Sequence, residues 1–411
     1  MALPRVNACG RSHLVASRPP TGGACPAAID PSLSFPRPPP DSWENRALGT
    51  LKASAHRTPR GRKLRLGVIG AGAWAVASHL PAFARRADVV EPLIINRRDS
   101  ALLQSIRDRF GFAHATTRWE DVVAERPDIV LVASPAGLHH EHAAAALDAG
   151  AHVLCEKPFT VAPDDAWDLV ARAKAGKREL VVAFGWNYLP MVVEAERLMT
   201  MDGGVGEIEH LSVTMASNTR ALLSGTMQVV EGSLAPSPDT WTDRDLAGGG
   251  YAQAQLSHAL ALALRLTDLR AREVFAYLGG GGTGAVELHD AIAIRFDGGG
   301  IGTVSGASNH GSDGGRHHLE LRVVGAHGEL LLDLEREALR RFLSSGDDVR
   351  VPVEPGDGRY DAVGPVDAIV DLALGHGVNR SPAELGARTT EVLEAVYRSA
   401  ATHAPAEIEP R

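Results

Sequence analysis

The chain is poor in cysteine, in aromatic residues and in long apolar runs. Its 411 residues include three cysteines, Cys9, Cys25 and Cys155, which are far apart and odd in number. They predict neither a disulfide framework nor a paired-cysteine metal site, and they suit a reducing, cytoplasmic location. No apolar run approaches the roughly 18 residues of a membrane-spanning helix, so we expect no membrane partner.

Positive charge is not in excess either. The chain has 42 Lys and Arg against 50 Asp and Glu, giving a formal net charge of −8. Nucleic acids are bound through clustered positive charge, so we expect no nucleic-acid partner. The hydrophobic content of 44% and the length predict two folded units with sizeable cores.

Residues 1–62 differ in composition from the rest of the chain. The stretches "SFPRPPPDSW" and "RTPRGRK" are rich in Pro and Arg and carry no periodic apolar residues. This composition predicts a disordered extension over 1–62, and it lacks the features of a secretory signal peptide. Two origins stay open: a genuine extension, or a start codon assigned too early, with the protein beginning near Leu51.

The remaining pattern predicts two domains. From Leu64, strand-like runs such as "DIVLVAS" alternate with helical runs such as "SALLQSIRDRF", which is typical of a doubly wound parallel sheet. We therefore expect an α/β Rossmann domain over 63–184. After it, runs such as "DAIAIRFDG" and "HLELRVVGA" are separated by glycines. They predict an α+β domain over 185–411 with a large, mostly antiparallel open sheet.

A glycine-rich turn follows the first expected strand, in "LRLGVIGAGAWAVASHLPAF". Gly70, Gly72 and Ala75 form the pattern G-x-G-x-x-A, with Ala73 and Trp74 completing the turn. The first glycine allows the tight turn, the second allows backbone to approach a pyrophosphate, and the small third residue lets helix and strand pack. The helix N-terminus adds free N–H groups, so these five residues are predicted to bind a dinucleotide.

The end of the second expected strand bears on the choice of nucleotide. An acid at this place usually binds the ribose 2′-hydroxyl of NAD, but the chain reads Asn96-Arg97-Arg98. Two guanidinium groups can bind a 2′-phosphate, which favours NADP over NAD. If both arginines belong to a solvated loop, the preference stays open.

The segment "ASPAGLHHEHAAAALDAGAHVLCEKP", from Ala133 to Pro158, resembles the oxidoreductase family named for glucose–fructose oxidoreductase and inositol dehydrogenase (Gfo/Idh/MocA). Together with the glycine-rich turn and the sheet-rich second half, the resemblance spans about residues 64–402. It implies a nicotinamide-dependent enzyme acting on sugars, cyclitols or related polyols. It also implies that the cofactor is contacted by Ser134, Pro135, His139, Glu156, Lys157 and Trp186.

The same resemblance implies where the substrate binds. Asn187 falls where the family turns from cofactor to substrate, and the buried Lys157 ammonium can polarise the reacting oxygen. Counted from the run Gly248–Gly250, His258 falls on the family's catalytic histidine. The family aspartate one turn earlier is Ala254 here, and Gln255 is a further candidate for the substrate pocket. We expect Lys157 and His258 to be the catalytic residues.

Other histidine clusters predict no metal site. His139 and His140 in "LHHEH" point apart on a helix, and adjacent His317 and His318 point to opposite faces of a strand. The glycine run 279–284 lacks a following helix and is interpreted as a hairpin loop.

The combined motifs predict an NADP- or NAD-dependent oxidoreductase that interconverts alcohol and ketone on a polyhydroxylated small molecule. Because Ala254 replaces the aspartate, a redox-neutral enzyme that recycles a bound nicotinamide is the alternative. A non-catalytic nucleotide-binding protein is a third interpretation. The exposed sheet face implied by the resemblance leads us to expect a homodimer or homotetramer.

Overall fold

The computed structural model describes residues 61–227, 234, 238–280, 286–311 and 317–411. The disordered extension expected over 1–62 lies almost wholly outside the described residues, as does most of the glycine run 279–284.

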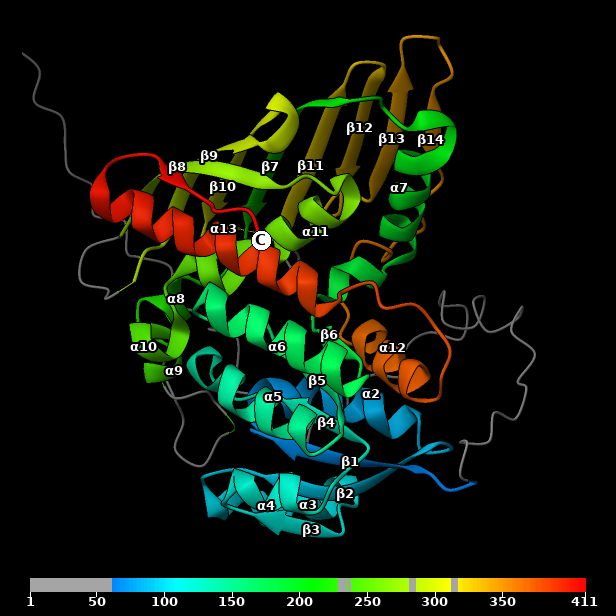
Figure 1. Ribbon diagram of the computed structural model, residues 1–411, viewed down its shortest axis with the longest axis vertical. Helices are drawn as coiled ribbons and strands as arrows, with labels where there is room; N and C mark the ends of the chain where they lie inside the picture. Colours follow the sequence, from blue (N-terminus) through cyan, green and yellow to red (C-terminus); the bar gives the residue numbers. More distant parts are fainter. Residues whose placement is uncertain (1–60, 228–233, 235–237, 281–285, 312–316) are drawn as a thin grey trace, which may run out of the picture.

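Six parallel strands form the first sheet, in the order β3-β2-β1-β4-β5-β6 (Figure 1). The strands are β1 (Leu64–Ile69), β2 (Val90–Asn96), β3 (His114–Thr116), β4 (Ile129–Val132), β5 (His152–Cys155) and β6 (Leu180–Val182). All four residues of β4 are buried, as a parallel strand covered on both faces requires. The predicted doubly wound parallel sheet is confirmed.

Helices cover both faces of this sheet. Apolar residues of alternate strand positions pack on one face against α4 (Trp119–Ala124), α5 (His139–Asp148) and α6 (Pro163–Gly176). The other face packs against α2 (Leu80–Arg85), α3 (Ser100–Phe110) and α12 (Val363–Ala373). Helix α12 lies in the sequence range expected for the second domain, yet it returns to the first sheet (Figure 1).

The second sheet has nine strands in the order β14-β13-β12-β11-β7-β10-β9-β8-β15. They are β7 (Ile208–Ala216), β8 (Ala271–Gly279), β9 (His289–Phe296), β10 (Ile301–Ala307), β11 (His318–Gly325), β12 (Gly328–Asp333), β13 (Ala338–Leu343), β14 (Val349–Val351) and β15 (Ala406–Glu407). Strands β7 and β10 pair in parallel and the other neighbouring strands are antiparallel. The predicted mostly antiparallel sheet is therefore confirmed.

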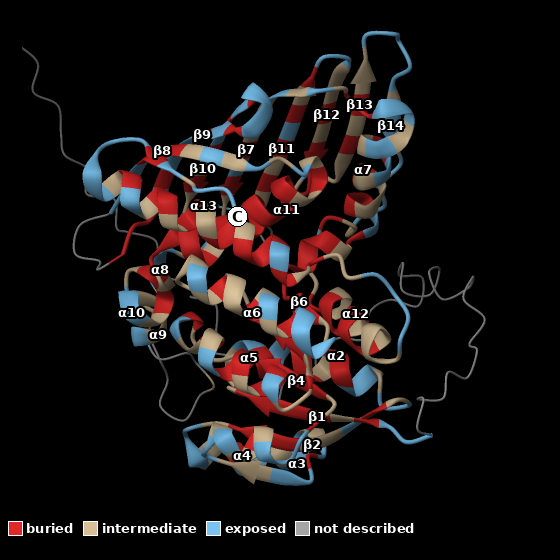
Figure 2. Cartoon of the chain, in the orientation of Figure 1, coloured by how far each residue is buried: buried red, intermediate tan, exposed pale blue. Residues whose placement is uncertain are grey.

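One face of the second sheet is covered and the other faces solvent. Helices α7 (Pro190–Thr200), α11 (Ser257–Thr267) and α13 (Ala383–Thr402) lie between this sheet and the first domain (Figure 1). Exposed and buried residues alternate strictly along β9, which is the pattern of a half-covered strand. Figure 2 shows the buried residues concentrated on the helix side.

Several elements had no clear sequence signal. Strands β3 and β14 have three residues each, too few for a period to appear. Helix α12 has no side-chain cap and no acid in its first turn, so nothing marks its start. Two expected helices begin with π-helical turns, η1 (Ala75–His79) before α2 and η5 (Ala252–Leu256) before α11. Both π-helical turns carry the motifs on which the function was predicted.

Candidate functional site

The glycine-rich turn has the geometry of a dinucleotide cradle. Gly70 has φ +87°, and a Cβ there would lie 2.6 Å from the backbone nitrogen of Ser134 at the end of β4. Gly72 is open: the nearest atom to a Cβ on it would be the Gly70 carbonyl oxygen at 3.9 Å. The first glycine therefore serves the fold, whereas the second leaves bare backbone, as the predicted approach of a pyrophosphate group requires.

The end of β2 joins this turn directly. The Asn96 carbonyl accepts a hydrogen bond from Ala71 N at 2.9 Å, and the Asn96 amide donates to the Thr116 carbonyl at 3.2 Å. Arg97 donates to the Ala71 carbonyl at 2.9 Å and pairs with Asp99 at 3.5 Å. Arg98 is exposed. Arg97 is thus hydrogen-bonded to the glycine-rich turn, whereas Arg98 faces solvent.

His139 holds together two loops at the carboxyl ends of β4 and β5. Its ring is 1% exposed; Nε2 lies 2.7 Å from the Ser134 carbonyl and Nδ1 lies 2.9 Å from the Pro158 carbonyl. Burial lowers the pKa of His139, against the opposing effect of the Ser134 carbonyl. Ser134 also bonds through its hydroxyl to His142, and Pro135 beside it is half-buried. The ring of His139 therefore supports the loops around the cradle.

Glu156 is a buried carboxylate that binds its surroundings through both oxygens. Oε1 accepts from Trp74 Nε1 at 2.8 Å and contacts His79, while Oε2 accepts from the backbone N–H of Lys157 at 3.0 Å. Burial alone would raise the pKa of Glu156, but the hydrogen bond and charge of His79 outweigh it and hold the pKa below its usual value. Glu156 is thus kept ionised next to the glycine-rich turn.

Lys157 reaches from the first domain to the helix that carries His258. Its ammonium donates to the carbonyl oxygen of Ala254 at 2.9 Å, inside the π-helical turn η5. Burial lowers the pKa of Lys157, and the charge of Glu156 partly opposes that shift. The residue that replaces the family aspartate therefore contributes its backbone oxygen to the lysine.

His258 lies in an aromatic enclosure. Its ring centroid is 5.0 Å from that of Trp186 and 5.2 Å from that of Tyr360, both edge-on. Burial places the pKa of His258 well below its usual value, and the positive charges of Lys157 and His317 add to the effect. At neutral pH His258 is therefore a neutral imidazole able to accept a proton.

Three polar atoms in or next to this enclosure are buried without a hydrogen-bond partner in the described part of the chain. They are Trp186 Nε1, an obligatory donor, His258 Nδ1 and His317 Nδ1. Buried polar atoms normally have a partner, so these atoms are candidates for contact with a polar ligand. Lys157, His258 and Trp186 thus converge on one site.

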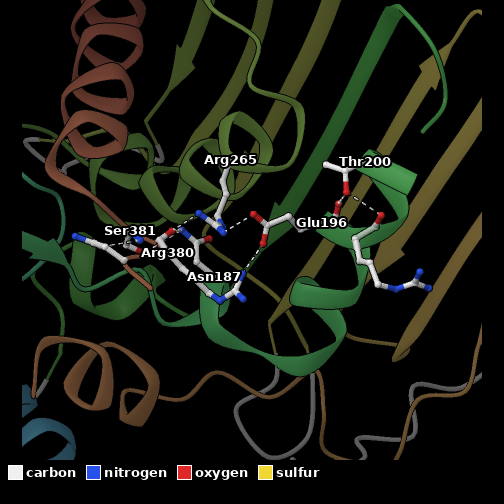
Figure 3. Close-up of polar contacts among 8 residues, drawn as sticks. Asn187, Glu196, Thr200, Arg265, Arg380 and Ser381 are labelled. Atoms are coloured by element: carbon white, nitrogen blue, oxygen red, sulfur yellow. Dashed lines mark hydrogen bonds and ion pairs between the residues drawn. The ribbon is translucent and has the colours of Figure 1, made fainter. Parts of the chain in front are cut away.

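The Asn187 amide group contacts the loop before α13, and its expected contact with substrate stays a prediction. Its amide donates to the Ser381 hydroxyl at 3.1 Å and lies 3.4 Å from the Arg380 carbonyl. Figure 3 shows it within a polar network that continues through Arg265 to Glu196. The structure therefore places the Asn187 amide in a network joining two helices to the loop before α13. Gln255 is half-buried in η5.

Sequence reasoning missed three site residues. His79, on η1, contacts Glu156, and its position four residues after Ala75 was the available signal. Tyr360 comes from an irregular segment before α12 and had no signal; its ring is 5.9 Å from Trp74 and 5.0 Å from Trp186. His317, half-buried, places its ring 5.6 Å from Trp186.

The described residues contain neither a metal-binding cluster nor a membrane-spanning helix. No group of three or more His, Cys, Asp or Glu residues there could hold a metal ion. No helix of the described segments has the length and apolarity needed to cross a membrane.

Two family models match the chain, one on each domain. Residues 64–184 match the oxidoreductase family with an NAD-binding Rossmann fold, and residues 194–331 match the GFO/IDH/MocA C-terminal domain. Together the matched ranges cover more than half of the chain. The chain belongs to the Gfo/Idh/MocA family of NAD-binding oxidoreductases, and the resemblance inferred from sequence is confirmed.

Particular relatives are dehydrogenases of sugars. The chain is 31% identical over 193 residues to D-glucoside 3-dehydrogenase of Escherichia coli K12, which covers 46% of this chain and 49% of the relative. It is 25% identical over 309 residues to levoglucosan dehydrogenase of Pseudarthrobacter phenanthrenivorans, which covers 67% of this chain and 75% of the relative. The chain thus spans about half the length of the first of these relatives.

A solved levoglucosan dehydrogenase, in complex with NADH and levoglucosan, has the same fold. The TM-score is 0.70 at 21% identity, and the match covers 85% of this chain and 100% of that structure.

Proposed function

We propose that the protein interconverts an alcohol and a ketone on a sugar, cyclitol or related polyhydroxylated ring, using a nicotinamide nucleotide. The observation that carries the proposal is the convergence of Lys157, His258 and Trp186, with a buried donor and a buried imidazole nitrogen left without partners. Membership of a family of NAD-binding oxidoreductases supports it.

The residues present fit a nicotinamide nucleotide. Gly72 offers open backbone at the start of η1, where a pyrophosphate can approach the helix N-terminus. Glu156 and Lys157 follow β5, at the carboxyl edge of the sheet where such ligands bind. A bound nicotinamide would accept or supply the hydride in the reaction.

The protein's own side chains would handle charge and the proton. The Lys157 ammonium, held by the Ala254 carbonyl, would hydrogen-bond to the reacting oxygen and stabilise negative charge as it develops there. Neutral His258 would accept the hydroxyl proton during oxidation and return it during reduction. Trp186 Nε1 would donate to a second oxygen of the substrate and orient the ring.

The test is turnover by a lysine variant. Purified protein is mixed with a panel of sugars and cyclitols, and absorbance of the reduced nicotinamide is followed. Lys157→Met, which keeps the length of the side chain, is expected to lower kcat/KM by about 10²–10⁴-fold while nucleotide binding changes little. Turnover by Lys157→Met equal to that of the wild type would remove Lys157 from the mechanism.

We further propose that NADP is preferred over NAD. Arg98 is exposed beside the end of β2, and Arg97 is anchored to the glycine-rich turn, so Arg98 is the residue available to a 2′-phosphate. A charge-assisted contact of this kind is worth about 1.5–3 kcal/mol. Arg98→Ala is expected to weaken NADP binding by about 10–100-fold and to leave NAD binding within about twofold. Equal losses for both nucleotides, measured by titration calorimetry, would contradict the preference.

Ala254 supports a second candidate, a redox-neutral enzyme that keeps and recycles its nicotinamide. His258 has no carboxylate one helical turn earlier, because Ala254 stands there and its carbonyl is bound by Lys157. Nucleotide that co-purifies with the protein, together with product formation without net reduction of nicotinamide, would favour this candidate over the dehydrogenase.

A further inference from the structure

We propose that Glu287 is a positioning residue for Lys157 and His258, and that it acts through the first turn of the helix on which His258 lies. The kinetic part of this proposal rests on the proposed function, whereas its geometric part does not. Glu287 precedes β9, far from both catalytic residues in sequence, and it is 5% exposed.

Glu287 binds three successive N–H groups of the turn leading into η5. Its Oε1 accepts from Gly250 N at 2.9 Å and from Ala252 N at 3.2 Å, and its backbone carbonyl accepts from Tyr251 N at 3.0 Å. The first N–H groups of a helix have no acceptor within the helix, and their dipoles favour a negative charge. A carboxylate from a distant segment thus caps this helix.

Tyr397 of α13 extends the cap by one residue. Its hydroxyl donates to Glu287 Oε1 at 2.7 Å and accepts from Gln253 N at 3.3 Å. The four residues from Gly250 to Gln253 are therefore held by one glutamate and one tyrosine. Because Tyr397 is anchored on the longest helix of the described chain, the cap is tied to the packed core of the second domain.

The positions of Glu287 and Tyr397 explain why glycines precede this helix. A Cβ on Gly249 would lie 2.0 Å from the Tyr397 hydroxyl oxygen, and a Cβ on Gly250 would lie 2.1 Å from the Glu287 carbonyl oxygen. No larger residue can stand at either position while Glu287 and Tyr397 are in place. The glycine run therefore provides room for the cap.

The cap is coupled to the catalytic lysine through Ala254. The N–H of Ala254 donates to the carbonyl of capped Gly250 at 2.8 Å, and the carbonyl of Ala254 accepts from the Lys157 ammonium at 2.9 Å. An aspartate side chain could follow the lysine by rotating about its own bonds. A backbone carbonyl cannot move independently of its turn. The position of the Lys157 ammonium therefore depends on the path of the turn that Glu287 holds. His258 follows one turn later on the same helix.

The experiment compares Glu287→Ala, Glu287→Gln and Tyr397→Phe. A matched control is Glu329→Gln, a change of the same kind on β12, where Glu329 pairs with Arg322 at the exposed face. For each protein, kcat, KM, the nucleotide dissociation constant and the melting temperature are measured. A crystal structure of Glu287→Ala gives the distance between Lys157 Nζ and the Ala254 oxygen.

Glu287→Ala is expected to lower kcat by about 10–100-fold, because small displacements of reacting groups cost this much, while nucleotide affinity changes by less than about threefold. Glu287→Gln keeps an acceptor at Oε1 and should recover most of that loss. Tyr397→Phe should lower kcat by about fivefold, and the control should match the wild type. In the crystal, the bond from Lys157 to Ala254 should be lengthened or broken.

An unchanged bond from Lys157 to Ala254 in Glu287→Ala, or a loss in Glu287→Gln as large as in Glu287→Ala, would overturn the proposal. If Glu287→Ala does not fold, an unchanged kcat in Tyr397→Phe overturns it instead. Should the wild type turn over no substrate with either nucleotide, the proposed function fails, while the crystal distance still decides the role of Glu287.

Discussion

At the scale of the residue, burial sets the chemistry of the two proposed catalytic groups. Lys157 and His258 lie in different domains, and burial is the first cause of the lowered pKa of each. Lys157 is thereby brought closer to exchanging a proton near neutral pH, whereas His258 is kept as a neutral imidazole. Burial would raise the pKa of Glu156 as well, but His79 and Lys157 together hold it below its usual value, so this carboxylate stays ionised.

Asp290 is a buried acid outside the site, and it predicts a pH dependence of stability. It is 5% exposed on the covered face of β9, and burial, aided by the charge of Glu287, raises its pKa to about 8. In the unfolded chain its pKa lies near 4, so the native state holds one more proton between about pH 4 and pH 8. Stability is therefore lost as the pH rises through this window, and the loss is complete above it.

Asp290→Asn is expected to reduce this dependence. Between pH 6 and pH 9 the wild type should lose on the order of 2–3 kcal/mol more free energy of unfolding than the variant does. Denaturant unfolding at both pH values measures the difference. Parallel losses in the two proteins would show that Asp290 is ionised in the native state at pH 6.

At the scale of the element, the two π-helical turns distinguish the site from the rest of the fold. Turn η1 brings Trp74 and His79 onto Glu156, and turn η5 presents the Ala254 carbonyl to Lys157. π-Helical turns are rare and occur often at functional sites. In each case the element was predicted as a helix, and only the folded backbone shows its irregular first turn.

Two variants of the glycine-rich turn, Gly70→Ala and Gly72→Ala, distinguish its role in folding from its role in nucleotide binding. Gly70→Ala places a Cβ 2.6 Å from Ser134 N at φ +87°, so it is expected to destabilise the free protein by about 2–4 kcal/mol. Gly72→Ala meets nothing closer than 3.9 Å and should change stability by less than about 1 kcal/mol. Its methyl group would cover the open backbone, so nucleotide affinity should fall at least about tenfold.

Thermal unfolding of both variants without nucleotide measures their stability, and nucleotide titration of Gly72→Ala measures its affinity. Full nucleotide affinity in Gly72→Ala would mean that the pyrophosphate does not approach this turn.

At the scale of the whole molecule, one face of the second sheet is left uncovered by helices in the described chain (Figure 2). Small exposed residues lie on this face, among them Ala293 on β9 opposite Thr303 on β10. Tyr277 on β8 is 67% exposed beside Phe275. A flat face of this kind can pack against a second sheet at about 10 Å. We propose that two copies of the chain associate through it.

Ala293→Glu tests this association. Light scattering of the wild type is expected to give at least twice the chain mass of 43.4 kDa. A glutamate on this face should shift the protein towards the monomer, because burying unpaired charges between two sheets is costly. Ala84→Glu, on the exposed side of α2, is the matched control and should leave the mass unchanged. A wild type of 43.4 kDa would refute the proposal.

Local patterns in the sequence determined the fold class, because strand and helix periods and the glycine signature depend on neighbours along the chain. The Gly70 turn, the parallel first sheet and the mostly antiparallel second sheet were predictable in this way. The family motif around Lys157, and the offset of His258 from the glycine run, located both candidate catalytic residues.

Only the tertiary structure decided what those residues touch. The pairing of Lys157 with the Ala254 carbonyl, the Glu287 cap and the packing of Tyr360 on Trp186 join segments from 37 to more than 170 residues apart. No local period encodes such contacts, since they arise when packing removes the groups from water and each buried polar atom must find a partner. For the same reason Asn187, predicted beside the substrate, has its amide bound to Ser381 and Arg380.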